Sequence, residues 1–219
     1  MRKGPVDSLI KAYMEHKVPY KNFMSTAQFI IFAGFHTTAG AITGLLWNLA
    51  QHQDVQKKLR ETLVAEGRDA HYMLWCIREA LRWDTSVPLG TGRMASEDMY
   101  TSDGIMVPKG SYVSPSIYSI HRDNNIWPEP DKFKPERWAN SSSFHPAAFM
   151  AFGLGLRNCP SGNSAIQEIK VMLDALGRRY QIDKCERTVD RYEVSSPGIF
   201  FSTPDHPVVV KLTPLNNVR

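Results

Sequence analysis

The chain has little cysteine, and its cysteines do not form a pattern that suggests a disulfide framework. Its 219 residues include three, Cys76, Cys159 and Cys185. An odd number of widely spaced cysteines argues for a reducing compartment and against a small secreted fold held together by disulfides. The length is sufficient for one large domain or two small ones with a hydrophobic core.

The start of the chain lacks the apolar run of a signal peptide. Residues 1–17 are charged throughout, so they predict neither a leader nor an anchor. Charge is missing further on, because residues 22–53 contain no Asp, Glu, Lys or Arg. Within them, residues 29–47 are long and apolar enough to cross a bilayer. His36 and several threonines interrupt this stretch, which favours a long helix buried in a large core, with a membrane span as the weaker alternative.

No concentrated positive charge indicates a nucleic-acid partner. The formal net charge of +4 comes from 26 Lys and Arg against 22 Asp and Glu, spread along the chain. Such mild basicity suits an acidic protein or a membrane surface better than a nucleic acid, and its simplest meaning is a solvated surface. Internal repeats and low-complexity segments are also missing.

Hydrophobic periodicity predicts a mostly helical fold with small sheets. Apolar residues at helical spacing predict helices over residues 54–66, 71–83 and 165–180. Short β-prone runs between glycines and prolines predict a small sheet within residues 88–120, and residues 198–212 predict a terminal hairpin that turns at residues 204–207. The prolines of WPEPDKFKPERW, residues 127–138, predict an irregular meander.

The loop FGLGLRNCPSG, residues 152–162, combines the features of a candidate site. Gly153 and Gly155 let the backbone approach a ligand closely, Arg157 supplies a cation, and Cys159 lies shortly before a predicted helix. A thiolate there would gain from backbone amides and from the helix dipole. A structural cysteine in a turn is the competing interpretation.

Several other roles fit this loop less well. A cysteine nucleophile needs a histidine base, and none of the seven histidines lies in a segment that marks it as one. A dinucleotide loop would need a preceding buried strand and a third glycine, and a zinc site would need more ligands. A thiolate bound to a larger cofactor remains, with Arg157 able to pair with the cofactor's carboxylates.

Two more motifs precede the loop. Glu79 and Arg82 are three residues apart on one predicted helix and can pair, with Arg137 as a candidate third member; an exposed pair of little energetic value is the alternative. The adjacent Thr37 and Thr38 lie inside the apolar stretch, where their hydroxyls either bond back to the preceding turn or relay protons to a cofactor.

The order of these motifs resembles the carboxyl-terminal half of a cytochrome P-450, a haem-thiolate monooxygenase. AGFHTT in a long apolar helix is followed by Glu-x-x-Arg, then by HRDNNIWPEPDKFKPERW, and then by Phe-x-x-Gly-x-Arg-x-Cys and a helix. The resemblance extends over residues 8–212. It implies that residues 1–219 are a single partial domain, mainly α with small β-sheets: a long central helix, the Glu-x-x-Arg helix, the meander, the cysteine loop and its helix, and a terminal β-hairpin. A membrane span over residues 29–47 loses support accordingly.

The resemblance implies a set of residues that bind haem b. Cys159 would be the axial thiolate ligand of the iron, a ligand that in this class pushes electron density onto the metal. Phe152 would shield the sulfur and Gly155 would permit the close approach. The haem propionates would be met by Arg157 and Arg93, with His121 in a strand near the same edge.

Proton delivery and substrate binding are implied in the same way. Thr37, preceded by His36, would help to deliver protons to bound O2, while the ion network of Glu79, Arg82 and Arg137 would lock the meander. The residues expected to line a pocket for a lipophilic substrate are Ala33, Val87, Leu89, Ile199 and Phe200.

The implied reaction inserts one oxygen atom of O2 into a lipophilic substrate and releases the other as water. Electrons would come from NADPH through NADPH–cytochrome P-450 reductase, with a cytochrome b-type protein as a second donor. The resemblance to microsomal members implies the cytosolic face of the endoplasmic reticulum membrane, with membrane association through the amino-terminal half and no nucleic-acid partner. A truncated haem-binding fragment or pseudoenzyme without turnover is the alternative.

The chain departs from the family pattern in ways that bear on activity. His36 stands where an acidic residue is usual, and Ser161 stands where a glycine is usual, with Gly162 one place later. If that position needs a positive φ or close contact with the porphyrin, serine would disturb the loop. The connector between residues 66 and 71 is also short, and the family's amino-terminal half does not precede these motifs.

Overall fold

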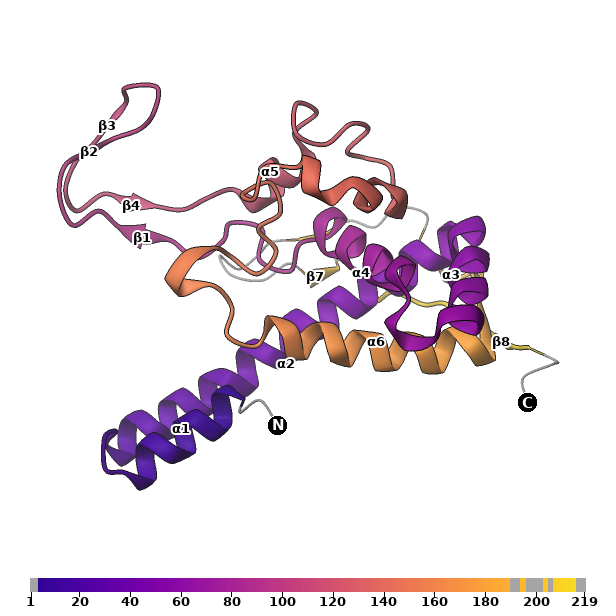
Figure 1. Ribbon diagram of the computed structural model, residues 1–219, viewed down its shortest axis with the longest axis horizontal. Coiled ribbons are helices and arrows are strands. Elements are labelled where there is room, and N and C mark those ends of the chain that lie inside the picture. The colour runs from indigo at the N-terminus through magenta and orange to yellow at the C-terminus, as the bar shows by residue number, and fades with distance from the viewer. Residues whose placement is uncertain (1–3, 190–193, 196–202, 205–206, 216–219) are drawn as a thin grey trace.

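The computed structural model describes residues 4–189, 194–195, 203–204 and 207–215, and within them the chain is mainly helical with small antiparallel sheets (Figure 1). The α-helices are α1 (Pro5–Met14), α2 (Tyr20–Gln51), α3 (Gln53–Glu66), α4 (His71–Trp83), α5 (Ile117–Arg122) and α6 (Gly162–Arg179). Short 3-10 helices occupy Gly67–Asp69, Pro135–Ser143 and Gly155–Arg157. The helices predicted over residues 54–66, 71–83 and 165–180 are confirmed as α3, α4 and α6.

The strands form four separate antiparallel pairs. β1 (Arg93–Met94) pairs with β4 (Tyr112–Val113), and β2 (Met99–Tyr100) pairs with β3 (Met106–Val107). β5 (Tyr180–Asp183) pairs with β8 (Lys211–Pro214), and β6 (Val194–Ser195) pairs with β7 (Thr203–Pro204). The predicted hairpin across residues 204–207 is therefore wrong: the strands on its two sides pair with β6 and β5, because each finds a partner earlier in the chain.

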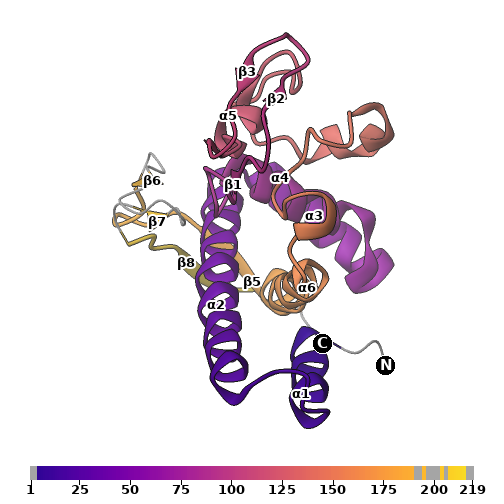
Figure 2. The same ribbon diagram turned by 90° about the vertical axis from the view of Figure 1, so that its left-hand side faces the viewer.

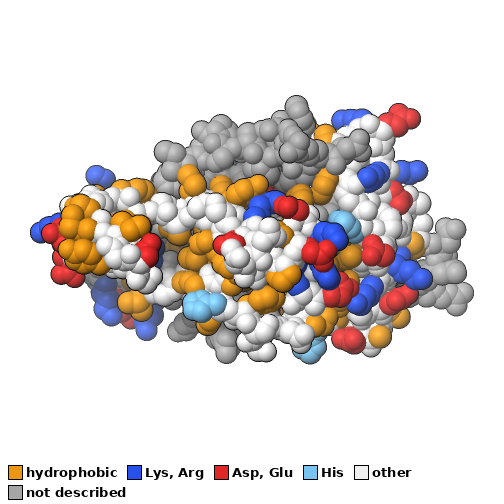
Figure 3. Space-filling model, turned by 90° about the horizontal axis from the view of Figure 1, so that it is seen from above, with side chains coloured by type: hydrophobic (Ala, Val, Ile, Leu, Met, Phe, Trp, Pro, Cys, Tyr) orange, Lys and Arg blue, Asp and Glu red, His pale blue; other side chains and the backbone are white. Residues whose placement is uncertain are grey.

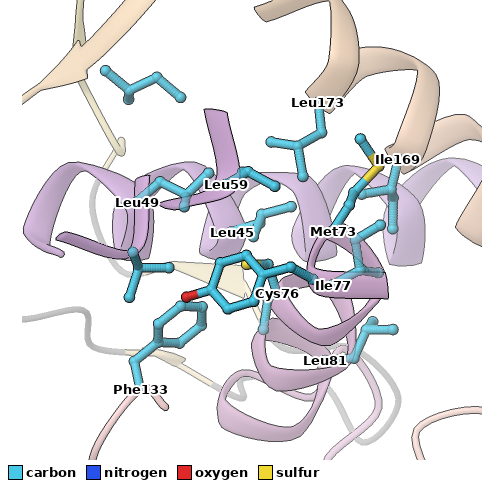
Figure 4. Close-up of a cluster of buried hydrophobic side chains, with 14 of the residues drawn as sticks. Leu45, Leu49, Leu59, Met73, Cys76, Ile77, Leu81, Phe133, Ile169 and Leu173 are labelled. Atoms are coloured by element: carbon cyan, nitrogen blue, oxygen red, sulfur yellow. The ribbon is translucent and has the colours of Figure 1, made fainter. Parts of the chain in front are cut away.

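The core lies where the second half of α2 meets α3, α4 and α6. Leu45, Leu59, Cys76, Ile77 and Leu173 point into it from these four helices, and none is more than 1% exposed (Figure 4). Full burial of an aliphatic side chain contributes about 1.5–3 kcal/mol. This packing therefore fixes α4, which carries the Glu-x-x-Arg motif, against α6, which follows the cysteine loop.

α2 is buried over its second half only. Its buried residues begin at Ala41, whereas Phe29, Phe32 and Phe35 are 65%, 50% and 68% exposed. In Figures 1 and 2 this first half projects from the body with α1 beside it. The prediction of a helix buried in a large core is thus wrong for the first half. By length and composition α2 could also cross a membrane, a test that core helices of soluble proteins pass as well.

The strands β1 to β4 form an extended arm, residues 93–113, that also exposes apolar side chains. Met94, Tyr100, Ile105 and Tyr112 are each 60–70% exposed. Figure 3 shows hydrophobic side chains gathered at the end of the molecule from which this arm and α1 project. Exposed apolar side chains that lie close together, as on this arm, are typical of an interaction surface and are uncommon on a soluble monomer.

His121 lies in helix α5, so its prediction in a strand is wrong. The hydroxyl of Ser116 at the N-cap accepts a hydrogen bond from the Ser119 backbone N–H (3.4 Å), which satisfies one free amide of the first turn. This local cap, together with burial of Ile117, outweighs the β preference of the isoleucine and tyrosine in the segment.

Candidate functional site

A buried carboxylate on α4 organises the segment behind the cysteine loop. Glu79 is fully buried and accepts hydrogen bonds of 2.9–3.0 Å from Nε and Nη2 of Arg82, Nε of Arg137, the backbone N–H of Lys134 and Nε1 of Trp138. A buried charge is tolerated only when it is paired and fully hydrogen-bonded. The structure thus brings together the three residues expected to form an ion network.

The two arginines of this network also hold the meander by its backbone. Arg82 donates from Nη1 to the carbonyl of His121 (2.6 Å) and from Nη2 to that of Pro130 (2.9 Å). Arg137 donates to the carbonyls of Pro128 (2.7 Å) and Glu129 (3.0 Å). The proline-rich segment cannot satisfy these carbonyls in a regular element, so the guanidinium groups take the place of a backbone ladder.

His121 lies behind the cysteine loop and is fully buried. Its Nε2 accepts a hydrogen bond from the backbone N–H of Met150 (3.0 Å), and its ring stacks on Phe149 with centroids 5.5 Å apart. Burial, with the nearby Arg82 cation, lowers the pKa of His121 to about 3, so the ring is neutral at physiological pH. The structure therefore shows His121 as a buried, neutral ring that accepts a hydrogen bond, and not as an exposed positive charge.

The cysteine loop is a tight turn closed by its own backbone. The N–H of Gly153 donates to the carbonyl of Met150 (2.9 Å), and the N–H of Cys159 donates to that of Phe152 (2.7 Å). Gly153 and Gly155 have φ of +70° and +69°, a region that side chains disfavour. The result is a surface loop that presents Cys159 three residues before α6.

Ser161 does not strain this loop. Its φ is −106°, so the backbone there does not need glycine. The tighter position is Gly162, because an added Cβ would lie 3.1 Å from Cδ1 of the Phe152 ring. The positive φ that serine would have disturbed is therefore not present at residue 161. The missing side chain of Gly162 leaves room for the Phe152 ring at the start of α6.

The three cysteines have different surroundings. Cys76 is fully buried in the core, and burial raises the pKa of its thiol well above the usual value. Cys185 is half-buried, and a hydrogen bond with Thr188 lowers the pKa of its thiol. Cys159 is exposed. Access and position before a helix thus single out Cys159 as the thiol that a bulky ligand can reach.

Thr37 is close to the segment that follows α4. Its hydroxyl donates to the carbonyl of Ala33 (2.8 Å), which is the bond back to the preceding turn considered above. Ser86 donates from Oγ to the carbonyl of Thr37 (3.0 Å), so the residues after it, the half-buried Val87 and the exposed Leu89, start next to α2. The structure thus places Ala33 and Thr37 one turn apart on α2 and joins α2 to Ser86, which precedes Val87 and Leu89, while Ile199 and Phe200 lie outside the described residues.

The remaining expected site residues are exposed. His36 lies on α2 with its ring edge-on to Phe32 and Phe35, at centroid distances of 5.0 and 5.3 Å. Arg93, on strand β1 as expected, donates from Nη1 to the carbonyls of Thr91 (3.0 Å) and Gly92 (2.8 Å). Arg157 is exposed in the cysteine loop.

The loop fits a flat apolar cofactor with anionic substituents. Leu154 is 44% exposed and Leu156 is fully exposed, on either side of the glycine turn that leads to the exposed thiol. A thiol, an apolar rim and the Arg157 guanidinium on one exposed loop match the thiolate ligation, the ring and the propionates of haem. Within the described residues, no group of three or more His, Cys, Asp or Glu side chains could hold a metal ion.

Sequence reasoning missed the contributions of Trp138 and Met150. Trp138 is the third side chain that donates to the Glu79 carboxylate, after Arg82 and Arg137, and the Met150 backbone N–H donates to the ring of His121. Trp138, the last residue of KPERW, could have been predicted to join the network, because an indole N–H needs a hydrogen-bond partner when it is buried. The backbone amide of Met150 carries no signal in a sequence.

Comparisons with known proteins point to one family. The profile of the family described as Cytochrome P450 matches residues 5–212. The chain is 33% identical over 199 residues to cytochrome P450 3A31 of Mesocricetus auratus, which is 84% of this chain and 38% of that protein. It is 34% identical over 206 residues to cytochrome P450 3A41 of Mus musculus (86% and 40%) and 31% identical over 218 residues to cytochrome P450 3A40 of Oryzias latipes (93% and 41%). The chain thus spans about two fifths of the length of these relatives.

Proposed function

Since this chain belongs to the cytochrome P450 family, we propose that it is the carboxyl-terminal, haem-ligating part of a monooxygenase for lipophilic organic substrates. The observation that carries the proposal is the exposed Cys159 in a loop with two glycines at positive φ, which His121 links to the buried network of Glu79 and Arg82. When bound, haem supplies the activation of O2, with electrons from NADPH through a reductase.

The chain's own residues have separate tasks in this proposal. Cys159 would hold the iron as a thiolate, and Phe152, which lies next to Gly162, would help to shield the sulfur once the cofactor covers the exposed loop. Arg157 and Arg93 pair with the propionates of haem, because guanidinium groups bind carboxylates in a charge-assisted manner.

The region around Thr37 is proposed to hold substrate and protons. The Thr37 hydroxyl donates to the Ala33 carbonyl, and by rotating about its side-chain bond it can donate a proton toward bound O2 instead, with His36 as its neighbour in the chain. Ala33, Val87 and Leu89 would contribute apolar contacts to a lipophilic substrate. The similarity to cytochrome P450 3A proteins supports a microsomal setting with a reductase as partner.

The test is the absorption spectrum of the chain after reconstitution with haemin, reduction and exposure to carbon monoxide. We expect the red-shifted Soret band of a thiolate-ligated haem, and we expect it to disappear in Cys159→Ala. Cys76→Ala and Cys185→Ala are matched controls that should retain the band. Failure of the wild-type chain to bind haem, or persistence of the band in Cys159→Ala, would refute the proposal.

A second candidate is a haem-binding fragment without turnover. The exposed apolar faces of the first half of α2 and of the arm formed by β1 to β4 favour it, because a substrate side that is open to water does not give a dry site for the reaction. The two candidates differ in one measurement: a chain with the thiolate band but without substrate-dependent NADPH consumption, in the presence of reductase, is the non-catalytic fragment.

A further inference from the structure

His121 connects helix α5 to the segment that leads into the cysteine loop. Its Nε2 accepts the backbone N–H of Met150 (3.0 Å), and its ring stacks on Phe149 at 5.5 Å with the two ring planes 13° apart. The side chain is fully buried. One imidazole thus holds two successive residues, one by its face and one by its edge.

Backbone hydrogen bonds continue from this point to the proposed ligand. The carbonyl of Met150 accepts from Gly153 (2.9 Å), and the carbonyl of Phe152 accepts from the N–H of Cys159 (2.7 Å). The first bond closes a turn of four residues, 150–153, and the second joins the two ends of the loop from Phe152 to Cys159, so two backbone hydrogen bonds connect the Met150 backbone with that of Cys159.

On its other side, His121 is fixed by the buried ion network. Arg82 donates from Nη1 to the His121 carbonyl (2.6 Å). Phe149, which the imidazole covers, also meets the edge of Trp138 at 4.9 Å, and Trp138 donates to Glu79. The imidazole therefore lies between a rigid, charged anchor and the loop.

The ring is held in one protonation state. Since Nε2 accepts a hydrogen bond, the proton of the neutral ring is on Nδ1. Nδ1 is buried and has no hydrogen-bond partner among the described residues. A buried donor without a partner is unfavourable, so the favourable contacts of the imidazole are the bond at Nε2 and the stacking on Phe149.

We infer that His121 is a positioning residue for Cys159, in which a neutral imidazole holds Phe149 and the Met150 amide and thereby sets the place of the thiolate. The part of this inference that concerns iron rests on the proposed function. The part that concerns the loop does not, and the two can be measured separately.

The experiment compares three variants of the full chain. His121→Phe keeps a ring on Phe149 but removes the acceptor, whereas His121→Gln offers an oxygen near the position of Nε2. His145→Phe is the matched control, because His145 also accepts a backbone N–H of this region, that of Ala147 (3.1 Å), but is exposed. Hydrogen exchange of the Met150 amide is measured without haem, and the reduced carbon-monoxide spectrum with haem.

We expect Met150 exchange in His121→Phe to accelerate about tenfold, as for the loss of one buried hydrogen bond. In His121→Phe we also expect the thiolate band to decrease at least about twofold, while the band of haem without a thiolate ligand increases. The thiolate band should recover in His121→Gln and should not change in His145→Phe. Unchanged exchange, or an unchanged thiolate fraction where the wild-type chain shows the band, overturns the inference. A wild-type chain without the band refutes the proposed function instead, and Met150 exchange alone then decides the loop contact. If His121→Phe does not fold, His121→Leu, which removes the acceptor without adding a second bulky ring, takes its place: faster Met150 exchange than wild type supports the acceptor role, and exchange equal to wild type overturns it.

Discussion

The buried Glu79 carboxylate provides a sharp test of how the cysteine loop is held. Glu79→Gln keeps the size of the side chain and removes its charge. The carboxylate accepts five hydrogen bonds from four residues. Oε1 of Glu79 accepts from Arg82 Nη2, Arg137 Nε and the Lys134 backbone N–H, and Oε2 accepts from Arg82 Nε and Trp138 Nε1. A glutamine offers one oxygen, and its NH2 group then faces N–H donors, so either Trp138 or Arg137 loses its acceptor.

Removal of one partner from a buried ion pair typically costs about 3–5 kcal/mol, because it leaves the other charge buried without compensation. Both side chains of the Glu79–Arg82 pair are fully buried, so solvent cannot replace the lost interaction. We therefore expect Glu79→Gln to lower the free energy of unfolding by about 3–5 kcal/mol. That is a large part of the total stability of a domain, about 5–15 kcal/mol.

The assay is urea unfolding followed by circular dichroism, with Glu136→Gln as the control. Glu136 belongs to the same segment and accepts from Lys58 (2.8 Å) and Tyr72 (2.9 Å), but its side chain is 42% exposed. An exposed pair contributes about 0.2–1 kcal/mol, so the control should lose no more than that. The reasoning is wrong if the two variants are destabilised equally, within about 1 kcal/mol.

Other variants test single contacts of the site and surface. Gly162→Ala brings a methyl group to 3.1 Å from the Phe152 ring, so by the same urea assay we expect a loss of about 1–2 kcal/mol; Ser161→Gly, where φ is negative, should change stability by less than about 0.5 kcal/mol. Between pH 6.5 and about 3 the unfolded chain binds a proton at His121 that the folded chain does not, because burial lowers its pKa. Stability should therefore rise with pH in that window, and His121→Gln should reduce the slope measured in urea unfolding at a series of pH values; an identical slope contradicts the assigned shift. Phe35→Ser, at a side chain that is 68% exposed, should leave the free energy of unfolding within about 0.5 kcal/mol of wild type and decrease the fluorescence of a bound hydrophobic dye; a large destabilisation would show that Phe35 is packed.

The helices were predictable from the sequence because local pattern and packing agree. In α4, Ile77 and Leu81 face the core at the expected spacing, and Gly67 ends α3 with φ of +78°. The pairing of Glu79 with Arg82 also followed from their spacing, since residues three apart share a face of a helix.

The failed predictions depend on contacts between distant segments. The partners of β7 and β8 lie earlier in the chain, and nothing in residues 198–212 indicates which strands they meet. His121 was expected in a strand, whereas a cap at Ser116 places it in a helix, where its ring accepts the amide of Met150. A backbone amide has no identity in a sequence, so such an acceptor can be found only in the structure.

The two sides of the proposed site differ in how they are supported. The loop that carries Cys159 is tied by backbone bonds and through His121 to the buried network of Glu79 and Arg82, all within this chain. The side expected to receive substrate and O2 rests on the first half of α2, whose apolar residues are exposed. The proposed ligation of iron by Cys159 therefore depends on contacts that the described residues already make. A pocket near Thr37 that excludes water would instead require the exposed apolar side chains of α2 to be covered. Thiolate ligation and turnover are consequently separable properties, so a thiolate band would establish the first without establishing the second.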